Sequence, residues 1–160
     1  MNNLDLKVFP DLKLLSLAAA DLFIDLQRKF GGGTFVVPGG KTPHLFYQYL
    51  ARNMKVWSNT TLLLSDERLV EENSVESNMG MIKYQLIDKI TVDTYPSLVP
   101  IVNGYQLEKS NQIIEMLNIK AKPLLPPAAA FLGVGKDGHT ASLFPDSEYD
   151  FFCEDPFIIV

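Results

Sequence analysis

Hydrophobic residues in the N-terminal segment recur at intervals of three and four positions. After Pro10-Asp11, the apolar positions that follow this spacing are Leu12, Leu15, Ala19, Leu22, Phe23, Leu26 and Phe30. Such spacing predicts an α-helix with one apolar face, and an aspartate before the first apolar position favours a helix start there. Gly31-Gly32-Gly33 ends the pattern, as glycine does at many helix C-termini. The chain is therefore expected to begin with an amphipathic helix.

Beyond Gly33 the pattern changes to short apolar runs, each followed by a turn and then by helical spacing. The predicted strands are Thr34–Val37, Thr60–Leu64, a segment near Leu98, and Ala128–Leu132. The helical segments that follow them contain Leu45 to Leu50, Ser77 to Asp88, the region up to Leu117, and Thr140–Phe144. Near-continuous apolar strands that alternate with helices are typical of a mostly parallel sheet in an α/β fold, with helices on both faces.

This pattern also predicts where a ligand would bind. No fixed-period repeat or linker divides the chain, so residues 1–160 are expected to form a single α/β domain. In open α/β sheets, ligands bind beyond the carboxyl ends of the strands. The turns Pro38–Pro43, Ser65–Glu76 and Gly133–His139 all follow predicted strands. They are therefore expected to meet at one edge of the sheet.

Charge and composition narrow the classes of partner. The chain has 14 Lys and Arg against 19 Asp and Glu, a net charge of −5, which argues against nucleic acid as a ligand. Any small anion must then be held by a local group of amides and cations. Asp21 and Asp25 interrupt the apolar stretch from Leu14 to Leu26, so no membrane span is expected. The single cysteine, Cys153, cannot form an internal disulfide, which favours a reducing, cytoplasmic location.

The turn Gly39-Gly40-Lys41-Thr42 has the composition of a phosphate-binding loop. Flexible backbone, a hydroxyl and a cation before a helix N-terminus allow backbone N–H groups to surround a phosphate. The alternative is a tight strand-to-helix turn with Pro43 at the first helical position. The residues alone leave both interpretations open.

Gly133, Gly135 and Gly138 match the GxGxxG spacing of dinucleotide-binding loops. After Phe144, however, the chain has no room for the helix, second strand and acidic ribose ligand which that fold requires. We therefore interpret the glycines as a tight turn, and no nucleotide cofactor is predicted.

The same turn presents Asp137 and His139. An imidazole can accept a proton from water near neutral pH when a neighbouring group fixes its tautomer, and Asp137 is close enough in sequence to do so. The other histidine, His44, falls within a predicted helix and is the weaker catalytic candidate. Two histidines without cysteine or paired carboxylates at ligand spacing predict no metal site.

Ser65-Asp66-Glu67-Arg68 follows a buried strand. Arg68 could hold a phosphate or carboxylate with two parallel hydrogen bonds, or it could form a structural ion pair with Asp66 or Glu67. Ser142 is a weak nucleophile candidate, because a GxSxG motif is absent and His139 is only one helical turn away. A water molecule is the preferred nucleophile.

Three motifs together resemble the 6-phosphogluconolactonase family. The segment Gly133–Pro145 closely resembles its histidine-containing signature. Asp66–Val70 with Ser77-Asn78, and Gly39–Pro43, are similar to two further motifs in the same order. The resemblance implies a Rossmann-like fold, related to that of glucosamine-6-phosphate deaminases. It also implies hydrolysis of 6-phosphogluconolactone to 6-phosphogluconate in the oxidative pentose phosphate pathway, without a metal or nucleotide cofactor.

Site roles follow from this resemblance by position. His139 is implied as the general base for water, with Asp137 beside it. Gly39, Gly40, Lys41, Thr42 and Arg68 are implied as ligands of the sugar phosphate, which is the expected small-molecule partner.

The chain also departs from the family. Pro38 and Lys41 stand where members commonly have serine, and the apolar run Asp155–Val160 resembles the start of a further strand. Members continue beyond this point, so the C-terminal part of the family domain is expected to be absent from these 160 residues. The alternatives are a glucosamine-6-phosphate deaminase-like isomerase and a non-catalytic sugar-phosphate-binding fragment. The sequence does not indicate the oligomeric state.

Overall fold

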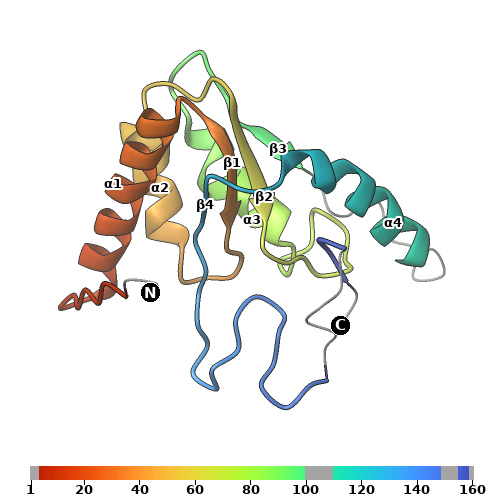
Figure 1. The fold of residues 1–160 in the computed structure, drawn as a ribbon. Helices are drawn as coiled ribbons and strands as arrows, with labels where there is room; N and C mark the ends of the chain where they lie inside the picture. Colours follow the sequence, from red (N-terminus) through yellow and green to blue (C-terminus); the bar gives the residue numbers. More distant parts are fainter. Residues whose placement is uncertain (1–3, 100–109, 149–154, 159–160) are drawn as a thin grey trace.

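The computed structural model describes residues 4–99, 110–148 and 155–158 and contains a four-stranded, fully parallel sheet (Figure 1). The strands lie in the order β3-β2-β1-β4 and comprise β1 (Gly33–Val37), β2 (Thr60–Leu64), β3 (Ser97–Val99) and β4 (Ala129–Ala130). β1 is central and pairs in parallel with both β2 and β4. The predicted parallel sheet is confirmed.

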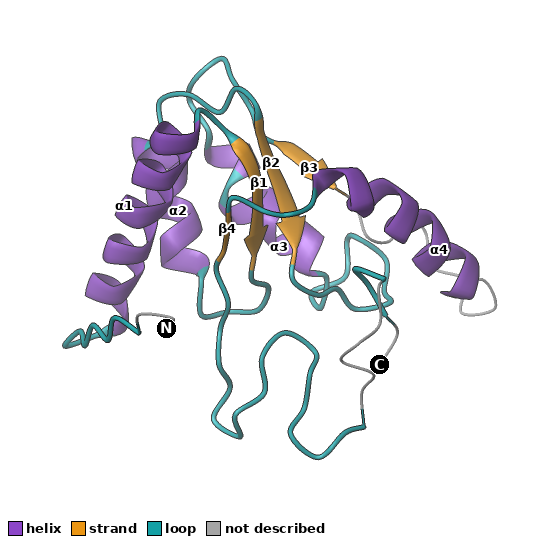
Figure 2. Cartoon of the chain, viewed as in Figure 1, coloured by secondary structure: helices purple, strands orange, loops and turns teal. Residues whose placement is uncertain are grey.

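Helices cover both faces of this sheet, as predicted (Figure 2). The main core lies on one face, where α1 (Leu12–Phe30), α2 (His44–Asn53) and α3 (Asn78–Gln85) cover the side chains of Phe35, Val37, Leu62 and Leu64. The opposite face carries α4 (Ser110–Ala121), whose Leu117 packs with Leu63 and Val99. Two short 3-10 helices, η1 (Ile87–Lys89) and η3 (Lys122–Leu124), follow α3 and α4. Alternate residues of the central strands thus face two separate cores.

The bounds of α1 follow from its caps. The Asp11 carboxylate accepts a hydrogen bond from the backbone N–H of Leu14 at 2.8 Å and caps the N-terminus. At the other end, Gly31 adopts a left-handed conformation with φ of 70°, and the Gly32 N–H donates to the carbonyl of Gln27. This is the hydrogen-bonding pattern of a Schellman motif. The helix predicted from Leu12 to Phe30 is therefore confirmed.

The predicted apolar face of α1 is confirmed only in part, because Phe23 is buried and Ala19 and Leu26 pack against the core, but the other predicted positions do not. The buried residues are Ser16, Ala20, Phe23, Ile24 and Gln27, whereas Leu12, Leu15, Leu22 and Phe30 are about half exposed, at 46%, 45%, 53% and 52%. Two of the buried side chains are polar and hydrogen-bonded. Gln27 donates to the hydroxyl of Thr60, and Ser16 donates to the carbonyl of Leu12. A satisfied polar side chain can be buried at low cost, so hydrophobicity alone identifies only part of the buried face.

The last predicted strand and helix are also corrected. The run Ala128–Leu132 contributes only the two residues of β4, which pair with Phe35 and Val36. No helix forms from Thr140 to Phe144. Thr140 and Leu143 instead exchange backbone hydrogen bonds of 3.2 and 2.9 Å across a turn in which Ala141 has φ of 52°. His139 therefore lies in a folded loop rather than at a helix start.

Parts of two other predictions fall outside the described residues. The first is the predicted unit from Leu98 to Leu117, of which residues 100–109 are not described, and the second concerns Cys153. Of the predicted final strand, residues 155–158 are described and are not a strand. The backbone of Phe157 is nevertheless fixed, because its N–H and C=O are bonded at 2.8 and 3.0 Å to the side-chain amide of Asn118 on α4.

Candidate active site

The loops that follow β1, β2 and β4 border an open cavity of about 560 Å³. Its wall contains the turn 38–43, parts of the segments 65–68 and 131–141, and Asn78, together with residues from the first two turns of α1. Six of the seven predicted site residues line it: Gly39, Gly40, Lys41, Thr42, Arg68 and His139. Asp137 is not in the wall but contacts His139. His44 begins α2 and does not line the cavity.

Asp137 holds His139 through one carboxylate oxygen. Asp137 Oδ1 lies 2.5 Å from Nδ1 of the His139 ring and 3.3 Å from its backbone nitrogen. Hydrogen bonds from the His139 side chain and backbone lower the pKa of the Asp137 carboxyl, because they stabilise its charged form. An ionised carboxylate can only accept, so Nδ1 carries the proton and Nε2 has the free lone pair. This arrangement suits His139 to accept a proton at Nε2.

Internal hydrogen bonds shape the loop that carries this pair. The Gly135 N–H donates to the carbonyl of His139 at 2.8 Å, and the Gly138 N–H donates to the carbonyl of Gly135 at 3.0 Å. Gly138 has φ of 91°, a conformation that favours glycine. The hydroxyl of Thr140 donates to the carbonyl of Gly133 at 2.9 Å. The loop is thus closed on itself around His139.

The glycine turn after β1 is held from two sides. The buried Tyr47 on α2 donates its hydroxyl to the carbonyl of Pro38 at 2.6 Å, and the Gly40 N–H donates to the side-chain oxygen of Asn78 at 3.0 Å. Burial, and then the nearby charge of Asp66, raise the pKa of the Tyr47 hydroxyl, so it stays a donor. Gly40 has φ of 78°, which explains the need for glycine.

In the glycine turn, the backbone N–H groups that are free to bind an anion are not the ones that a glycine-rich phosphate loop would lead one to expect. The Gly40 N–H is already bonded to Asn78. In the described part of the chain, the backbone N–H groups of Lys41 and Thr42 have no protein partner. Both precede the N-terminus of α2, where the helix dipole favours an anion.

Arg68 does not form the ion pair that the sequence left open as an alternative. Within residues 4–99, 110–148 and 155–158, no ion pair joins Arg68 to Asp66 or Glu67. The exposed guanidinium donates from Nη1 to the backbone carbonyl of Glu76 at 2.9 Å. Since a guanidinium has five N–H donors, Arg68 keeps donors for an anion in the cavity.

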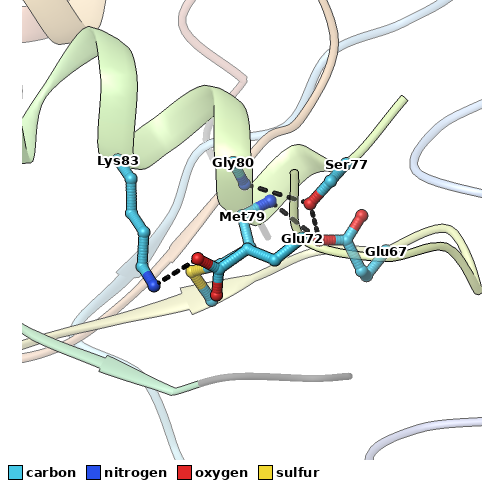
Figure 3. A network of polar contacts seen from close by, with 6 residues as sticks. All are labelled: Glu67, Glu72, Ser77, Met79, Gly80 and Lys83. Carbon is cyan, nitrogen blue, oxygen red and sulfur yellow. Dashed lines mark hydrogen bonds and ion pairs between the residues drawn. The ribbon is translucent and has the colours of Figure 1, made fainter. Parts of the chain in front are cut away.

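Glu67 has a structural task instead. Its carboxylate accepts hydrogen bonds from the backbone N–H groups of Arg68, Asn78 and Met79 at 2.7 to 2.8 Å, and from the hydroxyl of Ser77 at 3.3 Å. Figure 3 shows this carboxylate at the N-terminus of α3, where Ser77 also caps Gly80, and the nearby ion pair of Glu72 with Lys83. Glu67 therefore fixes the Arg68 segment to α3.

Asp66 connects the loop after β2 with the loop that carries Ser142 and with Asn78 on α3. Its carboxylate accepts from the Ser65 hydroxyl at 3.1 Å and from the Ser142 hydroxyl at 3.0 Å. Its backbone carbonyl accepts from the Asn78 amide at 3.0 Å. Sequence reasoning missed these links and that of Tyr47. The pair Ser77-Asn78 was part of a recognised motif, but nothing in its spacing indicated what Asn78 contacts.

Two further properties concern cofactors and membranes. Across the described residues, His, Cys, Asp and Glu side chains form no group of three or more that could hold a metal ion. None of the helices described here combines the length and the apolar character needed to cross a membrane.

A parallel sheet with a cavity at the carboxyl ends of its strands places the chain among the α/β proteins of Rossmann-like architecture. The family model of glucosamine-6-phosphate isomerases and 6-phosphogluconolactonases matches residues 11–156. The chain belongs to this family.

Individual relatives are similar over much of the chain. A 6-phosphogluconolactonase of Xylella fastidiosa is 35% identical over 118 residues, which are 73% of this chain and 47% of the relative. One of Neisseria meningitidis is 31% identical over 132 residues, 82% of this chain and 56% of the relative. The crystal structure of the Thermotoga maritima 6-phosphogluconolactonase is 26% identical, has a TM-score of 0.68, and aligns over 81% of this chain and 60% of that chain. This chain thus spans about half the length of the curated relatives it matches.

Proposed function

We propose that this chain carries the phosphate-binding and proton-accepting parts of a 6-phosphogluconolactonase. The reaction is hydrolysis of 6-phosphogluconolactone to 6-phosphogluconate by a water molecule that His139 activates. One observation carries the proposal: a histidine oriented by an aspartate lies in the wall of the same cavity as Arg68 and the glycine turn. The family and its 6-phosphogluconolactonase relatives support it.

The substrate phosphate is proposed to lie against the turn 41–42. Lys41, Thr42 and Arg68 line the cavity, and their N–H groups and two cationic side chains are donors of the sign that a phosphate requires. In a protein with a net charge of −5, such a local group of cations is what an anion requires. Binding the remote phosphate fixes the position of the lactone relative to His139, which lowers the entropic part of the barrier.

The chemical step then needs one base. His139 Nε2 takes a proton from water while the water oxygen attacks the lactone carbonyl carbon and forms a tetrahedral intermediate. As the intermediate collapses, the bond from that carbon to the ring oxygen breaks. The imidazolium returns the proton to the departing oxygen, which becomes a hydroxyl group. The Asp137 carboxylate stabilises the imidazolium between these two transfers.

The decisive experiment is a lactonase assay of the 160-residue chain with freshly generated 6-phosphogluconolactone. Spontaneous hydrolysis is measured in parallel, and His139→Ala is the matched variant. Turnover above background that disappears in His139→Ala, with 6-phosphogluconate affinity retained, supports the proposal. Equal turnover in the two proteins removes His139 as the base.

Two control measurements separate the alternatives. Because the family includes glucosamine-6-phosphate isomerases, the same preparations are assayed for ammonia release from glucosamine 6-phosphate. Ammonia release without lactone hydrolysis favours the isomerase. Thermal stabilisation by 6-phosphogluconate without any turnover favours a binding fragment, because a ligand that binds only the folded state stabilises it.

A further inference from the structure

We infer that Asn78 is a positioning residue for the phosphate-binding turn. Its side-chain amide accepts a hydrogen bond from the Gly40 N–H and donates one to the carbonyl of Asp66, so it joins the glycine turn to the segment that carries Arg68. The inference rests on the proposed function in one respect, which is that the ligand is a phosphate ester.

The position of Asn78 is itself tightly fixed. It is the first residue of α3 and is 2% exposed. Its backbone N–H donates to the Glu67 carboxylate at 2.8 Å, and both ends of its side-chain amide are bonded at 3.0 Å. A buried amide with all these bonds satisfied has one orientation, because any rotation would leave polar groups unpaired.

The glycine turn is shaped to receive this amide. A Cβ atom on Gly39 would collide with the side-chain amide of Asn78. The turn and Asn78 therefore approach each other more closely than any other residue at position 39 allows. Gly39 and Gly40 thus act together, one by leaving space for the amide and the other by donating to it.

This link has a specific consequence for binding. With the Gly40 N–H bonded to Asn78, the donors left for an anion include those of Lys41 and Thr42 on one segment and Arg68 on the other. The Asn78 amide joins the two segments directly. Without it, the two groups of donors lose their fixed spacing, whereas the Asp137–His139 pair is held by bonds within its own loop. Loss of Asn78 is therefore expected to raise KM and the dissociation constant far more than it lowers kcat.

The test compares Asn78→Leu with Gln85→Leu in the full 160-residue chain. Gln85 is a matched control because it is also a buried amide on α3, bonded to Gln48 and Lys89, but it does not line the cavity. Binding of 6-phosphogluconate is measured by NMR titration at a temperature where each variant is folded. Affinity is expected to fall at least about tenfold in Asn78→Leu and less than about twofold in Gln85→Leu.

A second readout is the hydrogen exchange of the Gly40 amide. It is expected to be slow in the wild-type chain and in Gln85→Leu, and fast in Asn78→Leu. Should Asn78→Leu fail to fold, Gly39→Ala provides the same test, because it displaces the Asn78 amide without removing any of its polar atoms. Wild-type affinity in either folded variant overturns the inference, as does an unprotected Gly40 amide in the wild-type chain.

Lactone turnover is recorded separately from binding. A chain that binds 6-phosphogluconate but does not hydrolyse the lactone refutes the proposed function and leaves the role of Asn78 to be decided by the affinities. A chain with turnover whose affinity does not depend on Asn78 refutes the inference and leaves the function intact.

Discussion

Gly135 packs against the imidazole of His139 so closely that no Cβ atom fits between them. A side chain at this position would meet both the ring and the Asp137 carboxylate, while the Gly135 N–H donates to the His139 carbonyl at 2.8 Å. The second glycine of the GxGxxG pattern thus belongs to the surroundings of the proposed base. Its spacing resembles that of a nucleotide-binding loop, but its physical reason is the close approach of a histidine ring.

Gly135→Ala is therefore expected to lower kcat sharply. The added methyl group forces the His139 ring away from its place, and a displacement of about 1 Å in a catalytic group can cost about a hundredfold in rate. Gly133→Ala is the matched control, since a Cβ at Gly133 meets nothing within 4 Å. Lactonase kinetics and 6-phosphogluconate titrations check both variants. Equal kcat values would contradict the described position of the ring.

Arg68→Ala is expected to weaken ligand affinity with little change in kcat. A hydrogen bond to a charged group contributes roughly 1.5 to 3 kcal/mol, which corresponds to a loss of about tenfold to a hundredfold in affinity. Arg52→Ala removes the same charge from an exposed position on α2 away from the cavity and serves as the control. The dissociation constant of 6-phosphogluconate is the measurement. If Arg68→Ala leaves both KM and affinity unchanged, Arg68 is a structural residue whose task is to bind the Glu76 carbonyl.

Some of the features on which these two predictions depend can be predicted from the sequence, and others cannot. Strands β1 and β2 are visible as continuous apolar runs because both of their faces are buried. The convergence of Lys41, Arg68 and His139 follows from the rule that parallel strands end at one edge.

Other features depend on contacts between distant segments. The face that α1 buries is decided partly by Gln27, whose amide finds a partner in Thr60. The bonds of Asn78 to Gly40 and of Ser142 to Asp66 join residues 38 and 76 positions apart. Hydrophobic periodicity carries no signal for such polar partners, so only the folded chain shows them.

Glu67→Ala is expected to destabilise the fold. The substitution leaves the backbone N–H groups of Asn78 and Met79 at the start of α3 without their carboxylate partner. Figure 3 shows the bond to Met79. Loss of a helix cap together with newly unpaired donors costs about 2 kcal/mol. Glu76→Ala removes the same charge from an exposed side chain in the same loop and is expected to be nearly neutral. Urea denaturation of the two variants gives the comparison; equal stabilities would show that Ser77 alone caps α3.

Asp137→Asn tests the histidine–aspartate pair through its pH dependence. Hydrogen bonds from the His139 side chain and backbone lower the pKa of the Asp137 carboxyl below its ordinary value of 3.8. The folded chain then binds this proton less tightly than the unfolded chain does. The stabilisation from the charged carboxylate is complete at pH values above 3.8 and is lost as the pH falls through the lower pKa of the folded state.

The melting temperature of the wild-type chain is therefore expected to exceed that of Asp137→Asn at neutral pH, and the difference should shrink below about pH 4. Asp146→Asn, at an exposed aspartate in the segment that follows, controls for the loss of one negative charge. Thermal denaturation between about pH 3 and pH 7 measures all three proteins, and NMR titration of the Asp137 carboxyl carbon locates its midpoint directly. A difference that stays constant across this range, with a midpoint at or above 3.8, would show that Asp137 does not hold His139 in solution. The orientation of Nε2 would then need another cause, because the bond at Nδ1 is what assigns the lone pair to Nε2.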